Sequence, residues 1–141
     1  MRIEHRVGVQ ASGDRIWEII SNLEAWHGWN PVYPEASGKI SYGGVLTLKE
    51  ALPNLPPRLI TGKVLAWTPR ELLHLQVSEG FMTHRVQYFE IDNLTETSCI
   101  FACGAIFKGF SAKAAAARVG RAFQLGMGVM AEALKARAER D

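Results

Sequence analysis

Long apolar runs and cysteine are both scarce in this sequence. The longest apolar run, from Cys99 to Phe107, is far shorter than the ~20 residues of a membrane-spanning helix, so no membrane span is expected. Cys99 and Cys103 are the only cysteines, and they share one strand-like run. At ~3.4 Å per residue their Cα atoms would lie ~13 Å apart, too far for a disulfide. The N-terminal residues MRIEHRVGVQ lack the apolar segment of a signal peptide, so a reduced, cytoplasmic protein is expected.

Several chemical signatures are missing as well. There is no GxGxxG pattern, phosphate-binding glycine loop or nucleophile elbow, so no cofactor is expected. Four scattered histidines and two cysteines give no metal-ligand spacing, so no metal is expected. The net charge is only +2, and the basic C-terminal segment also contains acidic residues. This pattern is typical of a solvated helix face and gives nucleic-acid binding little support.

The N-terminal third predicts one strand and two short helices. Apolar and polar residues alternate over residues 3–9, which predicts a half-buried strand. Ser12 or Asp14 can cap the helix that follows. The stretch LEAWHGWNP then predicts a second short helical turn, which its glycine and proline end.

The rest of the chain predicts a sheet followed by a long helix. Short connections favour antiparallel neighbours. From about Ser111 to Arg140 apolar residues recur every three or four positions, which predicts a helix of ~28 residues. The expected fold class is α+β: a curved antiparallel seven-stranded sheet wrapped around a long C-terminal helix, in a single domain over residues 1–141. The six further strands are predicted at Gly38–Tyr42, Val45–Glu50, Arg58–Trp67, Leu72–Val77, Met82–Ile91 and Thr97–Phe107.

This order of elements resembles the helix-grip proteins of the START-like or SRPBCC superfamily, in particular the polyketide cyclase/dehydrase-like branch. The matching pieces are DRIWEIISNLEAWHGWNP, GKVLAWTPRELLHL, and HRVQYFEIDN followed by IFKGF. They are patterns of packing and turn, and they specify the fold better than the function. The resemblance implies a cavity between the curved sheet and the last helix, open near the second short helix.

The aromatic residues near this implied opening have two interpretations. Trp26, Trp29 and Tyr33 can lie at the cavity mouth, where aromatic surface closes over an apolar guest. Alternatively, Trp26 and Trp29 anchor the two short helices to the sheet. Tyr33 lies just past Asn30-Pro31, in a predicted loop, and is expected to act as a gate. His27 is expected to face solvent.

The hairpin at Ser78–Gly80 decides which way two histidines face. A three-residue loop with glycine last would pair Val77 with Phe81, and so place His74 opposite His84 on one face. A two-residue Glu79-Gly80 turn is the alternative, and it would place His74 opposite Arg85. In the equivalent positions of the family these histidines look inward-facing. The resemblance therefore predicts a polar patch of His74, Gln76 and His84 inside the cavity, with Tyr88 further along the same face.

Apolar residues are expected to form the rest of the cavity wall. The strand Thr97–Phe107 would point Phe101, Cys103, Ala105 and Phe107 inward, with Cys103 as an inert small hydrophobe. Gly120, Gly126 and Gly128 interrupt the last helix at about 1 kcal/mol each. They would bend the helix or leave room for a ligand, or else allow close packing against the sheet or against a second subunit in a homodimer. The expected ligand-binding residues are Trp29, Tyr33, His74, Gln76, Met82, His84, Tyr88, Phe101, Phe123, Met127 and Met130.

Three functions are consistent with these features. The favoured one is binding of a hydrophobic small molecule, such as a lipid, a polyketide or an aromatic metabolite. The alternative is a cyclase- or dehydratase-like enzyme that uses His74, His84 or Tyr88 as general acid or base. The third is a co-chaperone role resembling the Hsp90-activator homologues, which would need an exposed apolar patch. The sheet's outer face is expected to be polar instead, with Lys49, Glu50, Lys63, Arg85 and Gln87.

Overall fold

Alternating apolar and polar residues form one antiparallel sheet of seven strands in the computed structural model, which describes residues 1–140. Its order is β1-β7-β6-β5-β4-β3-β2, so β1 lies at one edge beside β7 and β2 at the other edge beside β3. This confirms the predicted sheet. The strands are β1 (Arg2–Val9), β2 (Glu35–Gly38), β3 (Val45–Glu50), β4 (Arg58–Thr68), β5 (Leu72–Ser78), β6 (Thr83–Thr95) and β7 (Ser98–Gly109).

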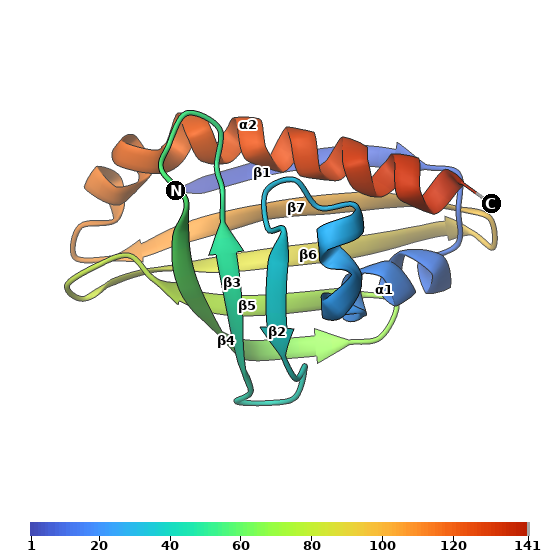
Figure 1. The fold of residues 1–141 in the computed structure, drawn as a ribbon, viewed down its shortest axis with the longest axis horizontal. Helices are drawn as coiled ribbons and strands as arrows, with labels where there is room; N and C mark the ends of the chain where they lie inside the picture. Colours follow the sequence, from blue (N-terminus) through green and yellow to red (C-terminus); the bar gives the residue numbers. More distant parts are fainter. Residues whose placement is uncertain (141) are drawn as a thin grey trace.

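Two short helices lie between β1 and the edge strand β2, and one long helix follows β7. The α-helix α1 (Gly13–Ser21) and the 3-10 helix η1 (Leu23–Gly28) connect β1 to β2. The Ser12 hydroxyl accepts a hydrogen bond from the Arg15 amide at 3.2 Å, so Ser12 caps α1. The helix α2 (Ala112–Glu139) crosses the sheet along β1 and β7, while β2 and β3 run across its direction (Figure 1). The helix-grip architecture is confirmed.

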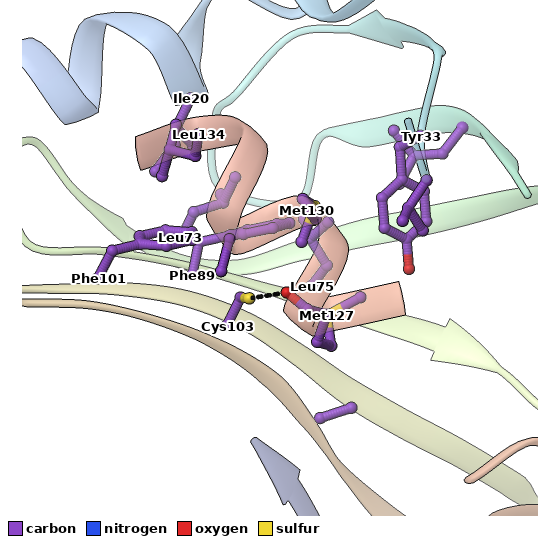
Figure 2. Close-up of a cluster of buried hydrophobic side chains, with 14 of the residues drawn as sticks. Ile20, Tyr33, Leu73, Leu75, Phe89, Phe101, Cys103, Met127, Met130 and Leu134 are labelled. Carbon is purple, nitrogen blue, oxygen red and sulfur yellow. Dashed lines mark hydrogen bonds between the residues drawn. The ribbon is translucent and has the colours of Figure 1, made fainter. Parts of the chain in front are cut away.

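The core lies between the sheet's inner face and α2. On β5, Leu73, Leu75 and Val77 are buried and define this inner face. The predicted apolar stripe of α2 packs onto it, and Met127 and Met130 are fully buried. Each fully buried side chain of this size contributes roughly 1.5–3 kcal/mol. Figure 2 shows side chains from α2 interleaved with those of the sheet, so protein atoms fill the space under the C-terminal half of this helix. Within residues 1–140, no helix is both long and apolar enough to cross a membrane.

The edge strand β2 lies earlier in the chain than expected. The sequence predicts a strand at Gly38–Tyr42, but β2 ends at Gly38, whose φ of 118° lies in a region that favours glycine. The chain then turns, and the Gly44 amide donates to the Ser41 carbonyl at 2.8 Å. The four residues of β2 show no apolar alternation, because this short edge strand buries little, and that is why the sequence pattern misses it.

The connection between β5 and β6 is longer than both predicted hairpins. The observed register pairs Ser78 with His84 and His74 with Tyr88, so residues 79–82 form the loop and Thr83 begins β6. Both predicted registers are therefore wrong. The physical reason is Glu79, which is buried and directs its carboxylate to Arg85 instead of taking part in a tight turn.

Candidate functional site

Polar residues occupy positions on the inner, apolar face of the sheet. Glu50 follows Leu48 with the strand period of two, and Arg85 and Gln87 precede Phe89 in the same way. Glu50 is 1% exposed, and Arg85 and Gln87 are fully buried. A buried charge is costly unless it is paired and hydrogen-bonded, so the position of these residues requires a polar network.

Arg85 lies at the centre of that network. Its Nη2 binds the Glu50 carboxylate, its Nη1 donates to Glu79 Oε1 at 2.7 Å, and its Nε donates to Gln87 Oε1 at 3.1 Å. The guanidinium also lies 5.1 Å from the ring centroid of Phe123 on α2, a cation–π contact. Arg85 therefore joins the sheet, the β5–β6 loop and the long helix.

Tyr33 completes the inner end of the network. Its hydroxyl donates to Glu50 Oε2 and accepts from Gln87 Nε2, both at 2.8 Å. Burial, and after it the Glu50 charge, raises the pKa of Tyr33 well above its ordinary value, so the phenol is neutral. Burial opposes ionisation of Glu50 too, but the charge and hydrogen bond of Arg85 outweigh it and lower the Glu50 pKa. Glu50 is therefore a carboxylate.

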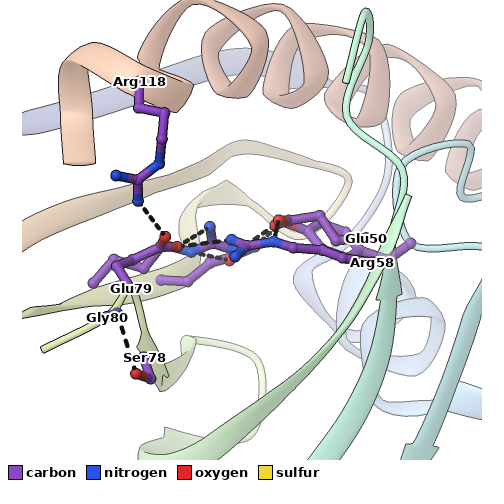
Figure 3. A network of polar contacts seen from close by, with 9 residues as sticks. Glu50, Arg58, Ser78, Glu79, Gly80 and Arg118 are labelled. Carbon is purple, nitrogen blue, oxygen red and sulfur yellow. Dashed lines mark hydrogen bonds and ion pairs between the residues drawn. The ribbon is translucent and has the colours of Figure 1, made fainter. Parts of the chain in front are cut away.

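Two further arginines reach the same carboxylates from the solvent side. Arg58 begins β4 and is paired with Glu50 across the strands; its Nε lies 3.1 Å from Glu50 Oε1 and its Nη2 lies 3.0 Å from Glu79 Oε1. Arg118 of α2 approaches Glu79 Oε2 to 3.8 Å (Figure 3). Within residues 1–140 this buried oxygen accepts no hydrogen bond. Three guanidinium groups thus meet two carboxylates, which leaves one positive charge in excess.

A cleft of about 330 Å³ opens beside these two arginines. The β3–β4 connection forms one wall and α2 the other. It is lined by Glu50, Leu52, Leu55, Pro56, Pro57, Arg58, Arg118 and Val119. It therefore combines an apolar surface with two half-exposed cations, whose side chains are 43% exposed for Arg58 and 59% exposed for Arg118.

A glycine of α2 allows the wall of this cleft to approach the helix. A Cβ at Gly126 would lie 3.0 Å from Leu52 Cδ2 and 3.4 Å from Pro53 Cδ, closer than ordinary packing. A side chain here would push the β3–β4 connection outward. Gly126 therefore packs closely against the β3–β4 connection, whereas packing against the sheet or a second subunit was expected from the sequence.

The predicted inward polar patch lies on the opposite face of the sheet. His74 and His84 do share a face, because the observed register differs from the three-residue hairpin by an even number of residues. That face is the outer one, because the buried residues Leu73 and Leu75 alternate with His74. The prediction of an inward patch is wrong for the whole set: His74, Gln76, His84 and Tyr88.

Local partners explain how these polar groups are held outside. His74 Nε2 lies 2.8 Å from Glu90 Oε2, and the Tyr88 hydroxyl donates to Glu4 Oε1 at 2.6 Å. Tyr88 lies over Gly104, where a Cβ would come within 2.9 Å of its hydroxyl and 2.2 Å of the Ile3 carbonyl. The bare glycine therefore allows a tyrosine to be buried on the outer face.

The aromatic residues of the LEAWHGWNP region pack in or against the core. Trp26 is buried, and its Nε1 donates to the Ile20 carbonyl at 3.1 Å, which matches the anchoring interpretation. Trp29 is half-buried and meets Trp26 edge to face, with centroids 5.9 Å apart. Tyr33 is fully buried inside the polar network, so the expectation of a gate is wrong. His27 is exposed, as predicted.

The predicted wall residues belong to the core. Phe101, Phe123, Met127 and Met130 are all buried, and the inward positions predicted for β7 are confirmed. Phe123 contacts the network through Arg85. Met82 differs, because it is 70% exposed in the β5–β6 loop.

Cys103 behaves as the predicted inert hydrophobe. Its Sγ lies 3.5 Å from the Met127 carbonyl, in the core. Burial, assisted by the Glu4 charge, raises the pKa of Cys103 to about 12. The thiol therefore stays protonated at neutral pH and is unreactive. In the part of the chain that the structure describes, no group of three or more His, Cys, Asp or Glu residues is placed to hold a metal ion.

Sequence reasoning missed the residues of the network and expected Glu50, Arg85 and Gln87 on the polar outer face. The signal was present, because the period of two assigns Glu50 to the face of Leu48, and Arg85 and Gln87 to the face of Phe89. The three residues were expected on the outer face because they are polar, although the period of two places them on the inner face. The pairs Glu50–Arg85 and Tyr33–Gln87 join distant segments, so these two pairings leave no local pattern. The missed residues are Glu50, Arg58, Glu79, Arg85, Gln87 and Arg118.

The fold defines a protein of the START-like, helix-grip class. Its sequence matches, over residues 1–139, the family described as polyketide cyclase / dehydrase and lipid transport, and the chain belongs to that family. No individual curated protein matches the sequence.

Solved structures from bacteria and a plant share the fold at low sequence identity. The Zhui aromatase/cyclase from Streptomyces sp. R1128 is 15% identical with a TM-score of 0.81, covering 99% of this chain and 94% of its own. A START superfamily protein from Mycobacterium smegmatis is 19% identical with a TM-score of 0.72, covering 98% and 97%. Norcoclaurine synthase from Thalictrum flavum is 17% identical with a TM-score of 0.73, covering 100% and 87%. These likenesses support the fold alone.

Proposed function

We propose that this protein binds an amphipathic small molecule in the cleft between the β3–β4 connection and α2. The apolar part of the ligand contacts Leu52, Leu55 and Val119, and an acidic group of the ligand pairs with Arg58 and Arg118. Membership of a family described by lipid transport and polyketide cyclisation supports a ligand of this kind. A fatty acid or an acidic polyketide has the required chemistry.

The excess positive charge at the cleft carries the proposal. Glu50 and Glu79 neutralise two of the three guanidinium groups, and the two arginines with exposed side chains both line the cleft. An anionic group bound there would complete the charge balance. Charge-assisted, two-point contacts to arginine are the strong form of carboxylate recognition.

The test is a titration of the purified protein with oleate and with oleyl alcohol, followed by isothermal calorimetry. We expect oleate to bind more tightly, and Arg118→Gln to reduce the affinity for oleate roughly tenfold, because one charged hydrogen-bonding partner is lost. Arg121→Gln is the matched control, since Arg121 is exposed on the same helix but does not line the cleft. Equal effects of the two substitutions would contradict the acidic anchor.

The position of the ligand is tested separately with a substitution that fills the cleft. Leu55→Trp would occupy the space between Leu52 and Val119 and is expected to abolish binding of both ligands. Leu125→Trp, at a half-exposed position of α2 away from the cleft, is the control. Unchanged binding in Leu55→Trp would remove this cleft as the binding site.

A cyclase-like reaction is the second candidate, and Glu50 is the observation that favours it. Glu50 lines the cleft as a carboxylate and holds Arg58, so the arginine would orient a chain of carbonyl groups and stabilise the negative charge that develops on an enolate. Polyketide cyclisation would then collapse in Glu50→Gln while oleate binding persists. His74 and His84 are not proposed for this role, because they lie on the outer face.

A further inference from the structure

Three large apolar side chains project into solvent at one end of the molecule. Phe81 is 78% exposed, Met82 70% and Phe110 82%. The first two lie in the β5–β6 loop and the third lies between β7 and α2; both connections are at the left end in Figure 1. We call these three residues the apolar tip. Single exposed hydrophobics are ordinary, but three neighbouring ones indicate an interaction surface.

Backbone contacts hold the two connections of the apolar tip together. The Phe110 amide donates to the Met82 carbonyl at 3.0 Å, and the Ser111 amide donates to the Thr83 hydroxyl at 2.9 Å. Gly109 permits this approach, because a Cβ there would lie 2.2 Å from the Met82 oxygen. The two connections that carry the three side chains are therefore held side by side.

The conformation of the loop exposes Met82 at a cost. Its φ is 47°, in the left-handed region that non-glycine residues seldom adopt. The beginning of the loop is anchored inward, because Glu79 is buried against Arg85. The loop thus has one end fixed in the core while its apolar residues point outward, and burial in the core does not account for their being apolar.

Only positive charge accompanies the apolar tip on its own segments. Residues 80–89 and 97–131 contain no Asp or Glu. Lys108 and Lys113 are exposed on either side of Phe110, and Arg118 and Arg121 follow on α2. The first turn of α2 has no acidic residue, so the positive end of the helix dipole adds to the field. Glu79, the acid that begins the loop, is buried and paired.

We propose that the apolar tip docks on the surface of an anionic phospholipid bilayer. Phe81, Met82 and Phe110 enter the boundary between headgroups and acyl chains, while Lys108 and Lys113 contact lipid phosphates. Glu79 contacts both Arg58 and Arg118 at the cleft, so the docked surface adjoins the cleft opening. The proposal does not depend on the cleft binding a ligand.

The test is co-sedimentation of the protein with vesicles of phosphatidylcholine alone or mixed with phosphatidylserine. The protein is expected to bind the mixed vesicles, and the double variant Lys108→Glu/Lys113→Glu to lower its partition coefficient by about tenfold or more. Phe81→Ser/Phe110→Ser is expected to lower it as strongly. Both pairs are exposed, so a urea titration should show unchanged folding.

Matched controls use exposed residues elsewhere on the protein. Leu94→Ser/Leu125→Ser removes two exposed leucines away from the apolar tip, and Lys39→Glu/Lys63→Glu reverses two other exposed lysines. Both controls should keep full vesicle binding. Absence of binding by the unaltered protein, or equal losses in tip and control variants, would overturn the proposal.

Discussion

Arg85 keeps its charge in the interior because the groups around it favour that charge. Burial lowers the pKa of Arg85, but Tyr33, Glu50 and Glu79 together raise it above its ordinary value. The carboxylates depend on Arg85 in turn, since Glu50 is 1% exposed and Glu79 is 7% exposed. This mutual dependence makes single substitutions more damaging than removal of the whole group.

Replacing Arg85 by leucine should destabilise the protein by roughly 3–5 kcal/mol, because Glu50 and Glu79 would be left buried without their main partner. Urea denaturation followed by circular dichroism measures this loss. His84→Leu is the matched control on the same strand, and it should change the free energy of unfolding by about 0.5 kcal/mol or less. A similar small loss in both variants would show that the network is not coupled in this way.

The pH dependence of stability should report Glu50. Its pKa is lowered in the folded state from the ordinary value of 4.5, so its contribution is fully present above 4.5 and is lost as the pH falls through the lower, folded value. Urea titrations between neutral and acidic pH should show this loss in the unaltered protein. In Glu50→Gln the dependence on pH below 4.5 should be shallower, although the variant is less stable overall. An unchanged slope would contradict the assignment.

At the scale of the elements, α2 has two different halves. Its N-terminal half carries Arg118 and Val119 at the cleft and Phe123 against Arg85, whereas Met130 and Leu134 are fully buried in the core. The turns of α2 that line the cleft are therefore different from the turns that carry Met130 and Leu134.

The helix glycines should respond differently to alanine. A Cβ at Gly128 would meet His5 at an ordinary 3.6 Å, so Gly128→Ala should stabilise the protein by up to about 1 kcal/mol through helix propensity. At Gly126 the same gain is opposed by the 3.0 Å approach to Leu52. Gly126→Ala should therefore stabilise less and should weaken oleate binding by moving the cleft wall. Thermal unfolding and calorimetry of both variants make the comparison, and equal stabilisation with equal binding would refute it.

The β5–β6 loop shows what local rules cannot supply. Ser78-Glu79-Gly80 has the composition of a tight turn, and local reasoning places its glycine at the end of one. The observed loop runs to Met82 because Glu79 gains more from Arg85 and Arg58 than from a short connection. Arg85 lies on the strand that follows the loop and Arg58 lies on β4, and rules for tight turns take neither contact into account.

Across the whole molecule, periodicity predicted the elements, and the expectation that charged residues lie outside failed for a few of them. The bounds of β3 follow from the alternation of apolar and polar residues, and nearly all of α2 follows from the helical repeat. Both patterns arise because one side of the element is buried. Glu50 and Arg85 break the rule that charges lie outside, and only the three-dimensional pairing shows why. The cleft depends on loop residues such as Leu55 and Pro56, whose position no periodicity determines.

Ligand binding should raise the stability of the whole protein. A ligand that binds only the folded state at 100 times its dissociation constant adds about 2.7 kcal/mol. Oleate should therefore raise the thermal midpoint of the unaltered protein and leave that of Leu55→Trp unchanged. Differential scanning calorimetry provides the measurement. A rise of the same size in both would place the ligand outside the cleft.

The division of α2 has a consequence for how this protein can diversify. Asn54, Pro56, Pro57 and the exposed positions near Arg118 can be randomised in a library without touching Leu52 or the methionines and phenylalanines of the core. Under the proposed function, a change in this loop is expected to alter which ligand is bound. Proteins that diverge in this way would differ at the cleft while keeping the same interior.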